Sequence, residues 1–473
     1  MWRINIMKSI KHLFFILLAV LVTATAAAQS DAFKLPKYEK FTLGNGLTVY
    51  LMEQHEVPMI NVSVILPAGA IYDGTQNGLA SLTATALKHG TKSMTQSQLE
   101  EELDYIGATL NTYASKESAG LSAKFAAKDR DKVMNIIKEV LTTPVFDAKE
   151  FEKEKQRTLA GLEQAKESPR SVIDDYYNGM LYSGHVYANP VSGRVSTVSK
   201  ITRDDVAKFY KSFYMPNGAA IAVVGDFNPK EMKTKLTTLF NSWAKGTAPA
   251  NVANKPVTAP TGAQVLLVNK DDARETTFYI GGPGINRSNP DFVAVEVINT
   301  VLGGRFTSWL NDELRVNTGL TYGARSNFAP LKNAGTFQIS TFTATKNTEA
   351  AMDKALEVYN KLHTKGIDEN TLTSAKNYVK GGFPPRYETA GQLASLLTQM
   401  YWYGFDESFI NNFQKTVDEL TVDKAKSIVT KYFPKNNLQF VMVGKAEDIR
   451  KVASKYGKVT EVQIKDDGVL KAF

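Results

Sequence analysis

The chain carries one helix-and-strand pattern twice. In the first half, a helical stretch over 204–213 precedes Tyr214-Met215-Pro216, an apolar strand and Gly225. Over 422–444 the same order of helix, Tyr-x-Pro, strand and glycine recurs, at an offset of about 218 residues. A repeat of this length predicts two similar domains, because a solenoid would repeat a much shorter unit.

Each half mixes strands with helices. Gly44-Asn45-Gly46 separates two short apolar segments, which is typical of a β-hairpin, and 60–66 has the composition of a strand. In the second half, 265–268 and 276–280 are expected to be strands. Since strands come before helices in each half, the sequence predicts an α+β fold of two homologous domains, each a mainly antiparallel sheet packed by helices on one face. Helices are expected over 78–89, 95–106, 129–142, 148–166 and 291–302.

The segment 246–264 separates the two halves. Its sequence, beginning GTAPANVANKPVTAPTG, is rich in Ala, Pro, Thr and Asn and has no apolar period, so it is predicted to be a linker. The predicted domains are therefore 36–245 and 265–473.

The N-terminus has the pattern of an export signal. Lys8 and Lys11 precede an apolar run over 13–22, and the small residues Ala26-Ala27-Ala28 follow it. This pattern predicts a signal peptide over 1–28 with cleavage after Ala28, an uncleaved anchor being the alternative. The chain also has no cysteine, so its fold needs no disulfide, which fits a bacterial periplasm.

Several kinds of chemistry are absent from the sequence. The net charge of +8 includes no long run of like charges, so nucleic acid is not an expected partner. No Gly-x-Ser-x-Gly elbow or phosphate-binding glycine loop occurs. The histidines beyond the signal segment are too far apart in sequence to share a helix face, which argues against a sequence-local zinc site. They are His55, His89, His185 and His363, and each is expected to be structural.

A resemblance appears around 78–91. Gly78-Leu79-Ala80 and, after six residues, Leu87-Lys88-His89-Gly90-Thr91 resemble the zinc-binding helix of insulinase/pitrilysin-type metallopeptidases. In that family His-x-x-Glu-His places two zinc ligands on one helix face, with the glutamate as the base that activates water. The resemblance puts Ser81 and Thr85 at the ligand positions and Ala84 at the position of the base.

The third ligand position of the family gives an independent comparison. The family places this ligand on a later helix, in a pattern like Glu-Lys-x-x-x-Leu-x-Glu. Glu154, Lys155 and Leu159 match its earlier positions, and Gly161 stands where the ligand would be. The resemblance therefore implies a degenerate family member without zinc on this chain.

The second half keeps residues that the family uses for substrate. The stretches 303–310, 313–315 and 319–323 resemble the family's C-terminal block, in which an arginine is followed seven residues later by a tyrosine. Arg315 and Tyr322 match both types and the spacing, which implies a substrate-binding role. The alternative is structural: Arg315 complements a helix C-terminus and Tyr322 is a half-buried strand residue.

Together these patterns lead to one functional expectation. The resemblance covers most of the chain and implies half of a clamshell: a non-catalytic, substrate-binding, processing-peptidase-like subunit of a two-chain zinc metalloendopeptidase. A partner subunit with an intact His-x-x-Glu-His motif would carry zinc, and peptide hydrolysis would need both chains. The alternatives are a periplasmic peptide-binding or scaffold protein without a protease partner, and an independent enzyme with an unseen site.

Overall fold

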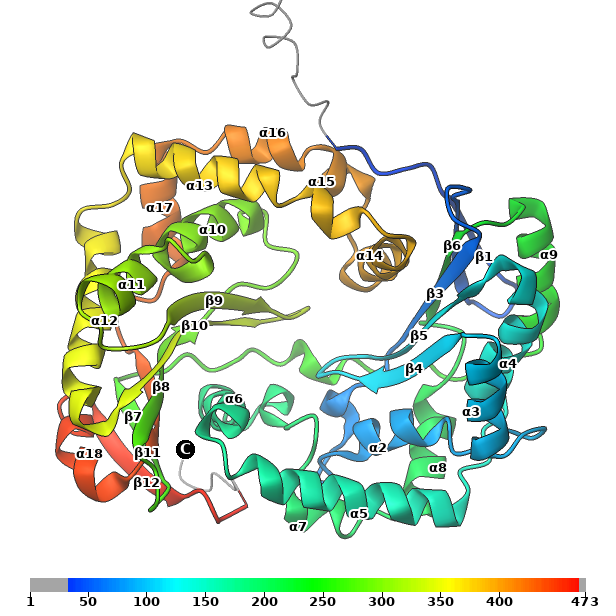
Figure 1. Ribbon diagram of the computed structural model, residues 1–473, viewed down its shortest axis with the longest axis horizontal. Helices are drawn as coiled ribbons and strands as arrows, with labels where there is room; N and C mark the ends of the chain where they lie inside the picture. Colours follow the sequence, from blue (N-terminus) through cyan, green and yellow to red (C-terminus); the bar gives the residue numbers. More distant parts are fainter. Residues whose placement is uncertain (1–32, 468–473) are drawn as a thin grey trace, which may run out of the picture.

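The computed structural model describes residues 33–467, which form two six-stranded sheets with helices around them (Figure 1). The predicted signal peptide over 1–28 lies outside the described residues and stays a prediction. Within 33–467, no helix is both long enough and apolar enough to cross a membrane.

The first sheet has the strand order β1-β2-β6-β3-β5-β4. Neighbouring strands are antiparallel except for β2 and β6, which are parallel. The strands are β1 Glu39–Thr42, β2 Thr48–Glu53, β3 Met59–Leu66, β4 Thr109–Ala114, β5 Ala119–Ala126 and β6 Ala220–Gly225.

The second sheet repeats this arrangement with the order β12-β7-β11-β8-β10-β9. Only one edge differs: β1 pairs antiparallel with β2, whereas β12 pairs parallel with the equivalent strand, β7. The predicted fold class of two homologous α+β halves is confirmed. The strands are β7 Gln264–Asn269, β8 Glu275–Pro283, β9 Ala324–Pro330, β10 Gly335–Ala344, β11 Gln439–Gly444 and β12 Lys458–Gln463.

The helices also correspond between the halves. Helix α8, Arg203–Phe213, and helix α17, Val422–Tyr432, each begin after a threonine whose side chain accepts a hydrogen bond from a backbone N–H in the first turn. The other first-half helices are α2 Leu79–Ala86, α3 Gln96–Tyr105, α4 Arg130–Thr142, α5 Ala148–Ala165, α6 Pro169–Leu181, α7 Val195–Val198 and α9 Pro229–Phe240. The second half has α10 Phe292–Asn299, α11 Trp309–Asn311, α12 Thr348–Thr364, α13 Glu369–Gly381, α14 Ala390–Tyr403, α15 Glu407–Asn411, α16 Phe413–Asp418 and α18 Ala446–Ala453, with π-helical turns η5 Thr300–Gly304 and η6 Asp312–Asn317.

The two halves exchange one helix each. Helix α6 belongs to the first half in sequence but packs on β8 and β11 of the second sheet (Figure 1). Its Ile173 and Tyr177 are fully buried in a cluster with Leu266, Val441 and Val443. Helix α6 thus covers the inner face of the second sheet, the face that the second half's own helices leave open.

Helix α14 of the second half covers the inner face of the first sheet in the same way. It comes from the second half and packs on β3 and β6 of the first sheet. Alternate residues of β6, Ala220, Ala222 and Val224, join its hydrophobic cluster, while Ile221 and Val223 face the first half's own core. The uninterrupted apolar sequence of β6 therefore reflects burial on both faces.

Polar contacts fix both exchanged helices. The hydroxyl of Tyr177 in α6 donates to the carbonyl of Phe337 in β10 at 2.6 Å. Gly281 permits this approach, because a Cβ atom there would lie 2.4 Å from that hydroxyl. In α14, the Thr398 hydroxyl lies 3.0 Å from that of Ser63 in β3.

The hairpins β4–β5 and β9–β10 also meet. Glu117, at the tip of the first hairpin, is 4% exposed and accepts hydrogen bonds from the backbone N–H of Lys332, at 3.0 Å, and from the Tyr187 hydroxyl. Burial raises the pKa of Glu117. The two halves are therefore joined by polar contacts at the hairpins as well as by the exchanged helices.

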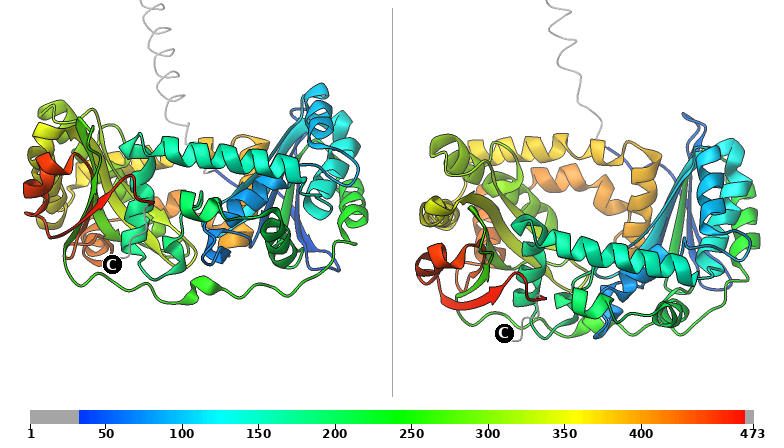
Figure 2. Two further views of the ribbon diagram at one scale, coloured as in Figure 1. Left: turned by 90° about the horizontal axis from the view of Figure 1, so that it is seen from below. Right: turned by 60° about the horizontal axis from the view of Figure 1, so that its bottom comes forward.

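The connection over 246–262 runs along the outside of the molecule between the halves and contains one short 3-10 turn, Val252–Asn254 (Figure 2). If the exchanged helices hold the halves together, this connection is dispensable once folding is complete. We expect protein cut at a protease site inserted between 246 and 262 to elute from a size-exclusion column at the volume of the uncut protein.

The matched control is the cut protein in urea, in which the two fragments should separate. Separation of the fragments under native conditions would contradict the proposed role of the exchanged helices.

Candidate functional site

Helix α2 carries the first two degenerate ligand positions. Most of its residues are buried, including Ala84 at the position of the family's base, which is 1% exposed. Only Ser81 and Thr85 are partly exposed, one turn apart on the same face. The Thr85 hydroxyl donates to the Ser81 carbonyl at 3.1 Å. The helix therefore presents two hydroxyls where the family presents two imidazoles.

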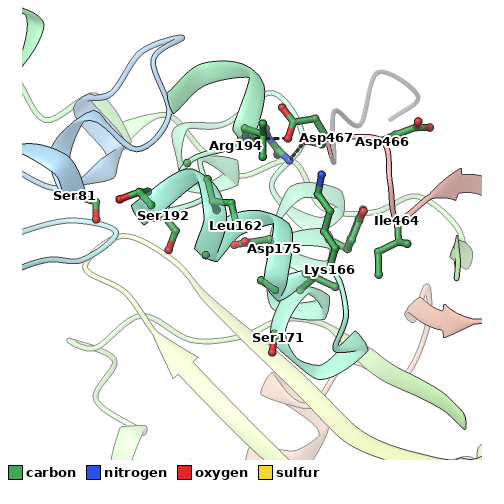
Figure 3. A pocket seen from close by; sticks show the side chains of 17 residues that line it. Ser81, Leu162, Lys166, Ser171, Asp175, Ser192, Arg194, Ile464, Asp466 and Asp467 are labelled. Carbon is green, nitrogen blue, oxygen red and sulfur yellow. Dashed lines mark hydrogen bonds between the residues drawn. The ribbon is translucent and has the colours of Figure 1, made fainter. Parts of the chain in front are cut away.

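Helix α5 carries the third position, Gly161. Ser81 and Gly161 line one cavity of about 370 Å³, so the structure brings these two positions together (Figure 3). Apart from the backbone of α5 itself, no atom of residues 33–467 would lie within 4 Å of a Cβ atom at Gly161, so a larger side chain there has room.

The residues at these positions do not fit zinc. Zinc in proteins is held by Cys, His, Asp or Glu side chains, and Ser81, Thr85 and Gly161 offer only neutral hydroxyls or no side chain at all. Among residues 33–467, no three His, Cys, Asp or Glu side chains come together in a way that could hold a metal ion.

A buried carboxylate, that of Asp73, stabilises the N-terminus of α2. Asp73 accepts hydrogen bonds from the backbone N–H groups of Gly78 and Ala80, each at 2.8 Å. These donors lie at the helix N-terminus, where a negative charge is favourable. Burial nevertheless raises the pKa of Asp73 to about 7. The helix keeps its place through this cap and through its buried apolar side chains.

The C-terminal segment closes one side of the cavity, which the sequence did not predict. Asp467 accepts hydrogen bonds from the backbone N–H groups of Val195 and Ser196, at 2.9 and 2.6 Å. Arg194 donates to the Asp467 carbonyl at 3.0 Å (Figure 3). Nothing in the residue pattern connects positions 272 apart. Asp175 of α6 lines the same cavity, and burial raises its pKa.

Arg315 and Tyr322 lie together in the second half. The Arg315 guanidinium lies 4.6 Å from the centre of the Tyr322 ring and 4.8 Å from that of Phe306. Both rings are exposed, Tyr322 by 75% and Phe306 by 64%. The three side chains line a cavity of about 350 Å³ on the inner side of the second sheet.

The surroundings of this pair differ in part from expectation. Arg315 lies in the π-helical turn η6, and Gly319 just beyond it has φ +62°, as expected for a helix end. Tyr322 is not a strand residue, because β9 starts at Ala324. Its ring is largely exposed, so the alternative reading of a half-buried strand residue does not describe it.

Ser81 and Gly161 thus line one cavity and Arg315 and Tyr322 another, while Thr85 lines neither of the two. Helix α6 borders both: Ser171 and Asp175 line the cavity beside Ser81, whereas Arg170 and Ile173 line the cavity beside Arg315. Within this chain, Arg315 and Tyr322 do not share a cavity with the degenerate metal positions.

Sequence comparison agrees with these features. The family profile described as insulinase, peptidase family M16, matches residues 48–194, and that described as peptidase M16 inactive domain matches residues 200–379. The chain belongs to the M16 peptidase family. It is a degenerate member, since Ser81, Thr85 and Gly161 replace the residues that the family pattern requires.

Individual M16 relatives have low sequence identity to this chain, but several of them align over most of its length. The "Non-peptidase homolog YmxG" of Helicobacter pylori is 24% identical over 83% of this chain and 90% of its own length. A probable mitochondrial-processing peptidase subunit beta of Arabidopsis thaliana is 25% identical over 59% of this chain and 52% of its own length. The crystal structure of a peptidase M16 inactive domain from Pseudomonas fluorescens matches with a TM-score of 0.82 and 25% identity, covering 86% of this chain and 98% of that one. These similarities support an inactive M16-type chain.

The placement of Ser81, Thr85 and Gly161 predicts that a metal site can be restored. The combination Ser81→His, Thr85→His and Gly161→Glu would supply two imidazoles and a carboxylate, the ligand types of catalytic zinc sites. We expect the triple variant to retain about one zinc per chain after dialysis, and the unchanged protein to retain none in stoichiometric amount. Elemental analysis of the dialysed proteins measures this.

The control combines Ser81→His and Thr85→His with Gly161→Gln, which fills the same space without a charge. Equal zinc content in the triple variant and this control would contradict the assignment of Gly161 as the third position.

His89, just after α2, predicts a pH dependence of stability. Burial lowers its pKa from 6.5 to about 4, and its Nδ1 atom has no hydrogen-bond partner among residues 33–467. Between these two pH values the unfolded chain binds the proton and the folded chain does not, so the free energy of unfolding falls as the pH decreases through this window. We expect His89→Gln to reduce that loss in urea unfolding experiments.

His55 provides the control, because a hydrogen bond to Asp226 raises its pKa and gives a pH effect of the opposite sign. His55→Gln should leave the loss of stability at low pH in place. The account of His89 is wrong if His89→Gln and the unchanged protein lose stability equally.

Proposed function

We propose that this chain is the non-catalytic, substrate-binding subunit of a two-chain M16-type zinc metalloendopeptidase that cleaves unstructured peptides. The partner is an insulinase-like subunit with an intact His-x-x-Glu-His motif, which holds the zinc and the attacking water. This chain supplies one wall of the closed assembly together with Arg315 and Tyr322.

One observation carries this proposal: the metal-binding residue types are gone while the Arg315–Tyr322 pair is present, with Tyr322 exposed and Arg315 half-buried. The Arg315 guanidinium lies over the Tyr322 ring, 4.6 Å from its centre. Contact with the ring face leaves the phenol hydroxyl available at the ring edge, and no hydrogen bond or ion pair among residues 33–467 occupies the guanidinium N–H donors. They could hydrogen-bond a peptide carbonyl, or the oxyanion that develops when the partner's water attacks it.

The form of the chain is also consistent with one half of an assembly. Its relatives include a chain that bears the name of a peptidase subunit. The predicted signal peptide would deliver the chain to the bacterial periplasm, where the zinc-carrying subunit would need to be exported as well. A lone peptide-binding or scaffold protein is the alternative outcome of the test below.

The test is reconstitution with the partner that co-purifies with the tagged chain. Using a quenched fluorescent peptide, we expect Arg315→Ala and Tyr322→Phe each to lower kcat/KM by about 10²-fold or more, the usual effect of removing a donor to an oxyanion. Thermal unfolding should show that both variants remain folded.

Arg130→Ala and Tyr105→Phe are matched controls on the outer helices α4 and α3, and they should leave kcat/KM unchanged. Full activity of the Arg315 and Tyr322 variants would contradict the proposed role of the pair. Purification of the chain without any zinc-carrying partner would favour the binding or scaffold alternative.

A further inference from the structure

The cavity beside Arg315 and Tyr322 has an unusual set of charges. Four arginines line it, together with aromatic and hydroxyl side chains, and no Asp or Glu is among the lining residues. The four arginines come from separate parts of the fold: one each from α6, from the segment that follows η5, from η6 and from β9. The four arginines, here called the arginine pocket, are Arg170, Arg305, Arg315 and Arg325.

Two of these arginines lack a counter-charge. Within the described part of the chain, neither Arg315 nor Arg325 forms an ion pair with a carboxylate, although Asp312 and Glu313 precede Arg315 in η6. The positive charges of the other two arginines, Arg305 and Arg170, are only partly compensated. Arg305 donates to the Ser374 hydroxyl at 3.0 Å, and Arg170 pairs with the exposed Glu275 at 3.2 Å.

The aromatic rings orient the guanidinium groups without using up their donors. Arg170 lies 3.4 Å from the centre of the Phe342 ring, and Arg315 lies over the rings of both Phe306 and Tyr322. A stacked guanidinium still points its N–H groups outward in its own plane. The pocket therefore holds several preorganised donors and uncompensated positive charge in a concave site, which focuses the field on an anion.

A carboxylate fits this arrangement best. Its two oxygens match the guanidinium fork and can accept paired, charge-assisted hydrogen bonds. The volume of about 350 Å³ suits a side chain or a chain end rather than a polymer, and the charge of +8 is not concentrated in long runs as in many nucleic-acid-binding segments.

We infer that the arginine pocket binds a carboxylate of a peptide whose backbone contacts Arg315 and Tyr322, so that the substrate class is acidic, unstructured peptides. This inference rests on the proposed peptide-binding function. It assigns Arg170, Arg305 and Arg325 to specificity, with no part in the chemical step.

Binding to the purified chain alone tests the inference. Fluorescence anisotropy at low salt would compare labelled, C-terminally amidated decapeptides that are identical except for two central Glu or two central Gln residues. We expect the Glu peptide to bind about tenfold more tightly, as for one or two charge-assisted hydrogen bonds. Arg325→Gln should bring the two affinities within about twofold of each other, while Arg130→Gln, on the outer helix α4, should keep the preference.

Each outcome has a separate meaning. Equal binding of the Glu and Gln peptides, or a preference unchanged by Arg325→Gln, would overturn the inference and leave the proposed function standing. A preference for single-stranded oligonucleotide over the Glu peptide would also overturn it. If a Gln peptide with a free C-terminus binds as well as the amidated Glu peptide, the carboxylate site is supported and its ligand is the chain end.

Failure of the proposed function would appear elsewhere. If the chain prefers the Glu peptide but no zinc-carrying partner co-purifies, the arginine pocket is supported and the protease-subunit role is not.

Discussion

The exchange of α6 and α14 is the constraint on which the rest of this structure depends. The central strands β6 and β11 are apolar on both faces. The helices of the half to which each strand belongs cover only one of its two faces. Each remaining face is buried by a helix from the other half. Exposing apolar surface of this extent to water is unfavourable, so the two halves are expected to be stable only together. The packing of these two helices also sets the relative position of the halves.

This arrangement also determines where the candidate sites lie. Helix α6 packs mainly over β8 and β11 on the inner face of the second sheet. The arginine pocket lies beside it, lined by residues of β9 and β10 and by Arg170 and Ile173 of α6 itself. The other side of α6 borders the cavity of the degenerate metal positions. A family member can therefore lose its metal chemistry by changes at Ser81, Thr85 and Gly161 without disturbing the fold, because α2 is held by Asp73 and by apolar packing.

The sequence predicted most helices and strands close to where the structure has them, because these elements depend on short-range patterns. The helix expected over 129–142, which the structure places at Arg130–Thr142, and the repeat itself follow from periodicity and spacing. The exchange of helices could not be predicted, since α6 and α14 have ordinary amphipathic patterns that do not say which sheet they cover. For the same reason the pattern could not reveal that Arg170, from the first half, joins Arg315 and Arg325 in the second, or that Asp467 closes the cavity near Ser81.

The central claim is that this chain is one half of a zinc peptidase and holds no zinc itself. Native mass spectrometry of the tagged protein, isolated from its own cells without chelators, tests this most directly. The account predicts a mass equal to this chain plus a second chain containing His-x-x-Glu-His, with about one zinc ion per pair that stays with the second chain when the pair dissociates. A lone chain or a homodimer, or zinc that remains on this chain, would contradict it.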